Sequence, residues 1–313
     1  MNLSAAIPPS TPAGPLGWAR ADFMALTKAR LSALVVVTTA AGYVLSPTGD
    51  FLSWGLVHTL LGTTMTAFGA AVFNQLMEME PDAKMQRTSD RPLPGRRISP
   101  VGAFLLGWVL CALGIMHLGV KVNAEASALA VLTLVSYLFI YTPMKQRSSL
   151  NTLVGAVSGA IPPVIGWVAG AGPHGLQPGL LRWELFVQPQ ALFLFSLLFL
   201  WQLPHFLAIN WMYREEYLRG GFVMWSNDDP TGAKTARLAL RWTIPMLGLA
   251  IWPVWAGFAS AWFVAPALLA TLYLVRLCLV FRRSGDRGDA RRLFFATLIY
   301  LPVMLSALLA AAR

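Results

Sequence analysis

The chain contains few charged residues and almost no cysteine. Of its 313 residues, 12% are charged and 56% are hydrophobic, whereas soluble domains carry about 25% charged residues. This deficit excludes an ordinary soluble domain and indicates a polytopic membrane protein. The two cysteines, Cys111 and Cys278, lie in apolar stretches. Their placement argues against a disulfide framework, and their spacing is not that of a metal site.

The first nineteen residues contain no charged residue and are rich in Pro, Ala and Ser. They lack the basic start and apolar segment of a signal peptide, and also the arginine-rich pattern of a transit peptide. We therefore expect a flexible tail at residues 1–19 and one membrane domain at residues 20–313. We also expect the protein to lie in a bacterial inner membrane.

Apolar stretches long enough to span a bilayer recur nine times. They lie near residues 23–46, 53–76, 100–120, 124–142, 150–171, 189–213, 240–258, 260–281 and 291–311. If the N-terminus lies in the cytoplasm, all but three of the 24 Lys and Arg residues fall in or beside cytoplasmic segments. The three exceptions are Lys121, Arg182 and Arg313. The net charge of +10 is therefore a signal of membrane topology and does not indicate nucleic-acid binding.

An acidic cluster follows the second stretch. Asn74, Glu78 and Asp82 are spaced four residues apart, so on a helix they form one stripe that rises roughly 12 Å. Pro81 disfavours helix at Glu80, which predicts that Asp82 lies just past the helix end. One amide and two carboxylates are hard oxygen ligands that suit Mg²⁺ on a phosphate. The alternative is a solvated helix end that balances nearby arginines.

Basic residues near the ends of the second and fourth stretches are candidates for phosphate binding. Arg87 and Arg91 are four residues apart and suit a bidentate clamp on diphosphate. The alternative is ordinary positive charge on the cytoplasmic side. Lys145 offers a point charge and Tyr141 a hydrogen-bond donor. The alternative for this pair is an interfacial aromatic residue beside a snorkelling lysine.

A second acidic pair, Glu215 and Glu216, follows the sixth stretch. These carboxylates predict a second metal site, and the alternative is an exposed loop start. Polar or amphipathic residues in the same stretch are Trp201, Gln202, His205 and Asn210. For His205 we favour a role in a pocket over that of a hydrogen-bonded core residue.

The fifth stretch opens with Asn151 and contains small residues at intervals that permit close helix packing. They are Gly155, Ser158, Gly159 and Gly166. The pair Pro162-Pro163 predicts a bend or break in mid-membrane, as occurs in helices that line cavities.

The run from Asn74 to Leu93 resembles the first signature of the UbiA-type intramembrane prenyltransferases. The residues that carry this resemblance are Asn74-Gln75, Glu78, Asp82, Arg87-Thr88 and Arg91-Pro92-Leu93. The segment Trp201-Gln202-Leu203-Pro204-His205-Phe206 resembles the protohaem IX farnesyltransferase branch of that family. Further agreement lies in residues 98–100, 141–145, 151–163, 214–217 and 220–221. Glu216 stands where the family's second acidic signature usually has Asp, and Glu78 stands where much of the family has Asp.

The resemblance implies an all-α bundle of nine transmembrane helices around a central cavity that opens to the cytoplasm. It also implies transfer of a farnesyl group from farnesyl diphosphate to a vinyl group of haem b with addition of water, giving haem O and diphosphate. The implied cofactor is Mg²⁺, the environment is the lipid bilayer, and a haem A synthase is an expected partner.

The same resemblance assigns roles to residues of this chain. Asn74, Glu78, Asp82, Lys145 and Glu216 are the implied catalytic residues, and the implied Mg²⁺ ligands are Asn74, Glu78 and Asp82, with Glu215 and Glu216 at a second site. Arg87, Arg91, Lys145 and Tyr141 are the implied diphosphate-binding residues. The implied haem pocket contains Trp201, Gln202, His205 and Asn151.

Two other functions stay open. The first is prenyl transfer to another acceptor, such as the aromatic ring of a quinone precursor. The second is a transporter or haem carrier, whose site would lie near the membrane midplane on broken helices. Dependence on Mg²⁺ and release of diphosphate would separate the enzyme from the transporter.

Overall fold

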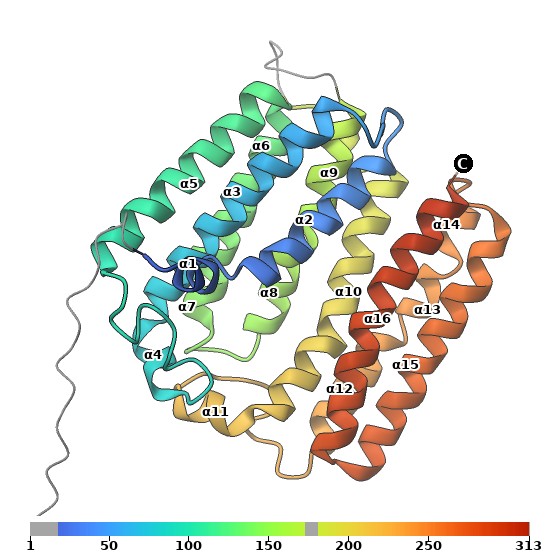
Figure 1. Cartoon of the computed structure of the whole chain (residues 1–313). Helices are drawn as coiled ribbons and strands as arrows, with labels where there is room; N and C mark the ends of the chain where they lie inside the picture. The colour runs from blue at the N-terminus through green and yellow to red at the C-terminus, as the bar shows by residue number, and fades with distance from the viewer. Residues whose placement is uncertain (1–17, 173–180, 313) are drawn as a thin grey trace, which may run out of the picture.

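The computed structural model describes residues 18–172 and 181–312, which form helices and contain no strand (Figure 1). The longer helices are α2 (Ala29–Val44), α3 (Trp54–Met77), α5 (Pro100–Lys121), α6 (Ala124–Val135), α10 (Pro189–Met212), α15 (Val264–Ser284) and α16 (Arg287–Ala311). The shorter helices are α1 (Arg20–Leu26), α4 (Met79–Lys84), α7 (Thr142–Met144), α8 (Asn151–Ala160), α9 (Pro162–Ala171), α11 (Arg214–Arg219), α12 (Ala233–Thr243), α13 (Met246–Leu249) and α14 (Trp252–Trp255). A π-helical turn, η1 (Ser136–Tyr141), and two 3-10 turns, η2 (Trp183–Leu185) and η3 (Ala261–Phe263), complete the set.

The predicted membrane spans are present. Within the described residues, eight helical segments are long and apolar enough to cross a membrane, and α1 and α2, joined at a 56° bend, bring the number to nine. The predicted tail at residues 1–19 falls mostly outside the described residues. The division into tail and membrane domain stays a prediction.

The seventh span begins earlier than the sequence predicted. It runs from Ala233 to Trp255, whereas the hydrophobic pattern placed it at 240–258. Its first helix, α12, carries Lys234, Arg237 and Arg241. Because these charged residues lower the local hydrophobicity, the hydrophobic pattern placed the start of the span too late.

Large apolar side chains cover much of the outer surface. Trp108 on α5, Phe139 on η1 and Leu269 on α15 are all more than half exposed. In water such a surface would be unfavourable, but hydrocarbon solvates it well. This surface and the spans identify a multi-pass membrane protein.

Small residues of the fifth span allow the close helix packing that the sequence predicted. A Cβ atom on Gly166 would lie 1.9 Å from the Thr39 carbonyl oxygen, and one on Gly42 would lie 1.9 Å from the Pro163 carbonyl oxygen. Glycine is therefore required where α2 and α9 cross. The predicted interruption also occurs, because α8 ends at Ala160 and α9 begins at Pro162, although Asn151–Ala171 still forms one candidate span.

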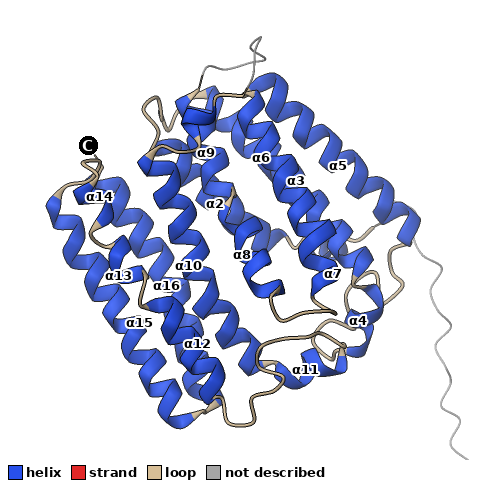
Figure 2. Cartoon of the chain, turned by 180° about the vertical axis from the view of Figure 1, so that it is seen from behind, coloured by secondary structure: helices blue, strands red, loops and turns tan. Residues whose placement is uncertain are grey.

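Connections that alternate along the chain gather at one end of the bundle (Figure 2). Helices α4 and α11, the link from α7 to α8 and the turn from α15 to α16 lie at this end, and the C-terminus lies at the other (Figure 1). Both acidic clusters therefore share one end, as predicted. The cytoplasmic orientation of that end stays a prediction.

Candidate active site

A cavity of about 160 Å³ lies at the end of α3 where the first acidic cluster begins. We call it the lysine cavity. Its charged lining residues are Lys28, Glu78, Asp82, Arg87, Arg91 and Lys145, and its polar ones are Tyr141, Asn151, Thr152, Asn210 and Tyr217. Its apolar lining residues are Met85, Phe206, Ile209, Phe222 and Met224. Charged and apolar groups therefore face one small space.

The backbone turns at Glu78 and brings two carboxylates to this cavity. Helix α3 ends at Met77, and α4 begins at Met79 and contains both Pro81 and Asp82. The prediction that Asp82 lies past a helix end at Pro81 is therefore wrong, because the break comes earlier. Pro81 is the third residue of α4, where a backbone N–H would have no intrahelical acceptor, so the ring is tolerated.

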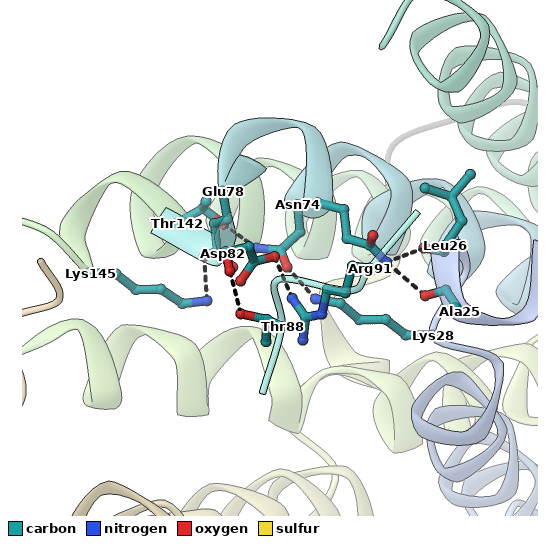
Figure 3. Close-up of polar contacts among 11 residues, drawn as sticks. Ala25, Leu26, Lys28, Asn74, Glu78, Asp82, Thr88, Arg91, Thr142 and Lys145 are labelled. Atoms are coloured by element: carbon teal, nitrogen blue, oxygen red, sulfur yellow. Dashed lines mark hydrogen bonds and ion pairs between the residues drawn. The ribbon is translucent and has the colours of Figure 1, made fainter. Parts of the chain in front are cut away.

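Each of these carboxylates is buried and paired with a cation, Asp82 with one from the loop after α4 and Glu78 with one from beyond α7 (Figure 3). Lys145 Nζ donates to Glu78 Oε1 at 2.5 Å, and Arg91 Nη1 donates to Asp82 Oδ2 at 2.5 Å. Glu78 is 5% exposed and Asp82 is 1% exposed. Buried charges persist only when paired in this way.

The charges of Glu78 and Lys145 reinforce each other. Burial alone would raise the pKa of Glu78, but the Lys145 and Lys28 ammonium groups hold it below its ordinary value of 4.5. Burial alone would lower the pKa of Lys145, but the Glu78 carboxylate raises it above its ordinary value. Both groups are therefore charged at neutral pH.

Lys28 is a third basic residue of the site. Its position in the sequence predicted only a charge on the cytoplasmic side of the membrane. It lies at the break between α1 and α2 with a left-handed backbone, φ 47°. Its Nζ donates to Asn74 Oδ1, and Asn74 Nδ2 donates to Thr142 Oγ1 at 3.3 Å. The available signal was a lysine inside the predicted span 23–46, since ionisable groups at membrane depth usually mark a site.

Gln75 fixes the segment that carries Lys28. Its Nε2 donates to the carbonyl oxygens of Ala25 at 2.7 Å and Leu26 at 3.0 Å (Figure 3). These carbonyls lie at the end of α1, directly before the bend. Two neighbouring residues of α3 therefore position Lys28. Asn74 binds its ammonium group, and Gln75 binds the backbone just before it.

Asn210 lies in the wall of the lysine cavity and has an unsatisfied donor. Its side chain is 5% exposed, and its Nδ2 has no hydrogen-bond partner among the described residues. A buried amide without a partner is unfavourable unless a ligand supplies an acceptor. From the sequence, Asn210 was recognisable as a polar residue of its apolar stretch, but no role followed from its position.

Tyr141 and Asn151 lie in the cavity wall, as expected for site residues. Lys145 Nζ lies 4.6 Å from the centre of the Tyr141 ring. Asn151 Nδ2 donates to the carbonyl oxygens of Ser148 at 2.7 Å and Val223 at 2.8 Å. Asn151 therefore ties together the loops that follow α7 and α11.

The other residues predicted for the haem pocket do not line the lysine cavity. His205 stacks on Trp201 and Phe294, with ring centres 5.2 and 4.8 Å away, and its Nδ1 lies 2.8 Å from Thr297 Oγ1. Gln202 Nε2 donates to Leu198 O at 2.9 Å within α10. These contacts place His205 between α10 and α16, and the haem contacts of all three residues stay predictions.

Glu215 and Glu216 line a different pocket, of about 600 Å³, which we call the arginine pocket. Its lining residues are Gln86, Arg87, Trp211, Met212, Tyr213, Arg214, Glu215, Glu216, Arg219, Gly285, Asp286 and Arg287. Glu216 Oε2 accepts a 3.4 Å hydrogen bond from Arg87 N, and Glu216 Oε1 lies 3.3 Å from Arg219 Nη2. Glu215 is exposed. The structure does not bring this pair into the lysine cavity.

Within the described part of the chain, no three His, Cys, Asp or Glu side chains gather closely enough to hold a metal ion. The carboxylates that line the lysine cavity belong to Glu78 and Asp82. Asn74 is not part of the lining, and its Oδ1 accepts a hydrogen bond from Lys28, which is part of it. Mg²⁺ usually takes one or two carboxylates together with phosphate oxygens and water. This donor set therefore fits a metal that binds together with a diphosphate, and it does not fit an all-protein cage.

Sequence comparison relates the chain to membrane prenyltransferases. Residues 35–299 match the UbiA prenyltransferase family. A protein named protoheme IX farnesyltransferase from Solibacter usitatus is 36% identical over 292 residues, which cover 90% of this chain and 96% of that protein. The mitochondrial protoheme IX farnesyltransferase of Arabidopsis thaliana is 40% identical over 285 residues, which cover 91% of this chain and 63% of that longer protein.

Structural comparison shows the same fold. A solved structure of digeranylgeranylglyceryl phosphate synthase has a TM-score of 0.74 at 14% identity and covers 93% of this chain and 97% of its own. A UbiA homolog from Archaeoglobus fulgidus bound to GPP and Mg²⁺ has a TM-score of 0.61 at 12% identity, covering 92% and 99%.

Proposed function

We propose that this chain, which belongs to the UbiA prenyltransferase family, transfers a farnesyl group from farnesyl diphosphate to a vinyl group of haem b. Water is added in the same reaction, and the products are haem O and diphosphate. The observation that carries this proposal is the similarity to proteins named protoheme IX farnesyltransferase, at 36–40% identity over 90% or more of this chain. The charged cavity supplies the chemical reason.

The lysine cavity suits a diphosphate leaving group. Diphosphate leaves slowly until its negative charge is neutralised, and fixed cations in a water-poor site provide this neutralisation efficiently. Lys28, Arg91 and Lys145 already line the cavity, so no rearrangement is needed to bring these cations to a bound diphosphate. Arg87 lines the same cavity and adds a fourth positive charge.

The reaction needs no covalent enzyme intermediate. The bond between the first farnesyl carbon and the diphosphate oxygen breaks, and its electron pair leaves with diphosphate. The terminal vinyl carbon of haem b supplies the electrons of the new carbon–carbon bond. The cation that remains on the porphyrin-side carbon takes oxygen from water, which then loses a proton. Apolar lining residues such as Phe206 and Phe222 keep water from the allylic cation before the vinyl group reacts.

We infer that Asn74, Glu78 and Asp82 would hold Mg²⁺ together with the diphosphate. When bound, the metal supplies Lewis-acid neutralisation of the leaving group. Solved relatives bound to prenyl diphosphates and Mg²⁺ support this assignment. The catalytic role of Glu216 and the second metal site at Glu215 and Glu216 rest on the sequence resemblance alone.

We place the protein in a bacterial inner membrane with the lysine cavity facing the cytoplasm. The supporting observation is that all but three of the 24 Lys and Arg residues fall in or beside the segments assigned to the cytoplasm. A haem A synthase that consumes haem O is the expected downstream partner.

Mass analysis of haem tests the proposal directly. Membranes that contain the protein are supplied with haem b, farnesyl diphosphate and Mg²⁺, and the haem is then extracted. We expect a species heavier by one farnesyl group and one hydroxyl group, and we expect none without Mg²⁺. Unmodified haem together with diphosphate release on a quinone precursor would assign the enzyme another acceptor. Absence of diphosphate release with every acceptor would favour a transporter or haem carrier.

A further inference from the structure

The arginine pocket adjoins the lysine cavity but differs from it in its lining. Arg87 lines both spaces, so they share a wall. The arginine pocket, at about 600 Å³, falls within the usual size range of small-molecule sites. It therefore has room for part of a substrate that also reaches the lysine cavity.

Three guanidinium groups of this pocket have no carboxylate partner among the described residues: Arg87, Arg214 and Arg287. Each is supported by an aromatic ring instead. Arg214 Cζ lies 4.2 Å from the Trp211 ring centre, and the Cζ atoms of Arg87 and Arg287 lie 5.2 and 5.9 Å from the Tyr213 ring centre. A ring orients a guanidinium and leaves its N–H donors available.

Three carboxylates also line the pocket, and within the described residues none of them forms an ion pair with Arg87, Arg214 or Arg287. Glu216 is engaged by Arg219 at 3.3 Å and by the Arg87 backbone N–H. Asp286 Oδ2 accepts from Gly288 N at 2.6 Å and caps α16. Glu215 is exposed and has no ion pair among the described residues. The pocket thus presents unpaired forked donors, which match carboxylates.

We propose that the arginine pocket binds the two propionate carboxylates of the haem acceptor. This inference rests on the proposed function. In haem b the propionates leave one half of the macrocycle and the vinyl groups leave the opposite half. A haem whose propionates contact Arg214 and Arg287 can therefore direct its vinyl edge past Arg87 toward the lysine cavity.

The cations of the lysine cavity are poorer candidates for this task. Lys145 and Arg91 already face Glu78 and Asp82 at 2.5 Å, and the diphosphate requires them. Assigning the propionates to the arginine pocket gives each anionic substrate its own cations. Acceptor and donor then bind without competing for the same charges.

Two variants and one modified acceptor test the inference. Arg214→Gln and Arg287→Gln remove one cation each, and haem b dimethyl ester removes the negative charge of both propionates. The matched control is Arg292→Gln, because Arg292 pairs with Asp289 at 2.8 Å and lines neither cavity. The measurements are KM for the haem acceptor, KM for farnesyl diphosphate and the mass of the product.

We expect each variant to raise KM for haem b roughly ten-fold, the usual effect of losing a hydrogen bond to a charged group. KM for farnesyl diphosphate should not change in either variant. The control Arg292→Gln should have the wild-type KM for both substrates. Wild-type protein should bind the ester worse than haem b, and the variants should lose nothing further on the ester. An equal loss on both acceptors, or a rise in KM for farnesyl diphosphate alone, would overturn the inference.

The wild-type comparison remains decisive if a variant does not fold. Farnesylated product from haem b and its ester with equal KM would overturn the propionate assignment and leave the proposed function intact. Folded wild-type protein that farnesylates neither acceptor would overturn both. A lower KM for haem b than for the ester in wild-type protein, abolished in the variants, would support the inference.

Discussion

The segments that follow α3 and α10 both place carboxylates at the end of a membrane span, but they differ in structure. After α3, Glu78 and Asp82 are almost fully buried, and each lies 2.5 Å from a cation. After α10, Glu215 is exposed, and within the described parts of the chain Glu216 forms one ion pair, with Arg219 at 3.3 Å. Thus an acidic cluster at the end of a span does not by itself determine the kind of site.

The difference arises from what covers each segment. The bend at Lys28, the loop that carries Arg91 and the end of α7 all close over the residues after α3. Helix α11 instead borders an open pocket of about 600 Å³. Burial forces the first set of carboxylates into fixed pairs with cations, whereas the second pocket retains cations without partners. The first arrangement suits neutralisation of a leaving group, and the second suits recognition of an anionic substrate.

The strongest test of this comparison removes one carboxylate from each segment. Asp82→Asn should lower kcat/KM roughly a thousand-fold, because it removes charge from the proposed metal site in a water-poor cavity. Glu216→Gln should lower kcat/KM by less than about ten-fold, because its ion-pair partner Arg219 is largely exposed to solvent and such pairs contribute little. Steady-state kinetics with haem b and farnesyl diphosphate measures both. Equal losses of kcat/KM in the two variants would show that Glu216 has the catalytic role that the sequence resemblance implies. They would contradict the functional difference between the two segments.

A second test concerns the cation that hydrophobicity patterns overlook. Lys28→Met should lower kcat/KM with farnesyl diphosphate by roughly a hundred-fold, because a fixed positive charge is lost beside the leaving group. The control is Lys84→Met, since Lys84 lies exposed at the end of α4. Similar kinetics for the two variants would remove Lys28 from the site.

Asn210 and Asn151 form a matched pair in one cavity wall. Asn210→Ala should raise KM for farnesyl diphosphate roughly ten-fold while leaving stability unchanged, because its buried Nδ2 has no partner to lose. Asn151→Ala should lower stability by about 1–3 kcal/mol, because two loop carbonyls lose their donor. Thermal unfolding in detergent separates the two. Destabilisation by Asn210→Ala without a change in KM would assign it a structural role.

Much of the molecule follows from sequence periodicity and charge. The nine stretches, the shared end of both acidic clusters and the close packing of Gly166 were all predictable, because each depends on composition within one segment. The spacing of Asn74, Glu78 and Asp82 predicted a stripe across the end of the second span, but Asp82 lies in α4. Their role as metal ligands stays a prediction.

Contacts between distant segments were not predictable in this way. Lys28 donates to Asn74 from a bend at which its backbone adopts φ 47°, and the hydrophobicity of the sequence carries no information about that bend. The pocket role predicted for His205 stays a prediction. The packing of its ring between Trp201 and Phe294 could not be read from the sequence, because Phe294 belongs to α16, far along the chain.

The smallest expected effect lies in the acid stability of the two segments. Burial raises the pKa of Glu78, but Lys145 and Lys28 together lower this pKa by more than burial raises it. The pKa of Glu78 in the folded protein therefore lies below its ordinary value of 4.5. The Glu78 carboxylate therefore stabilises the fold fully above about pH 4.5, and this contribution is lost as the pH falls through the folded pKa. Glu78→Gln should be less stable than wild type at pH 7, and the difference should narrow below about pH 4.5. Glu215→Gln, in the exposed segment, should follow the wild-type curve throughout. Thermal unfolding from pH 7 to pH 3 measures this, and a constant gap between wild type and Glu78→Gln would contradict a buried, charged Glu78.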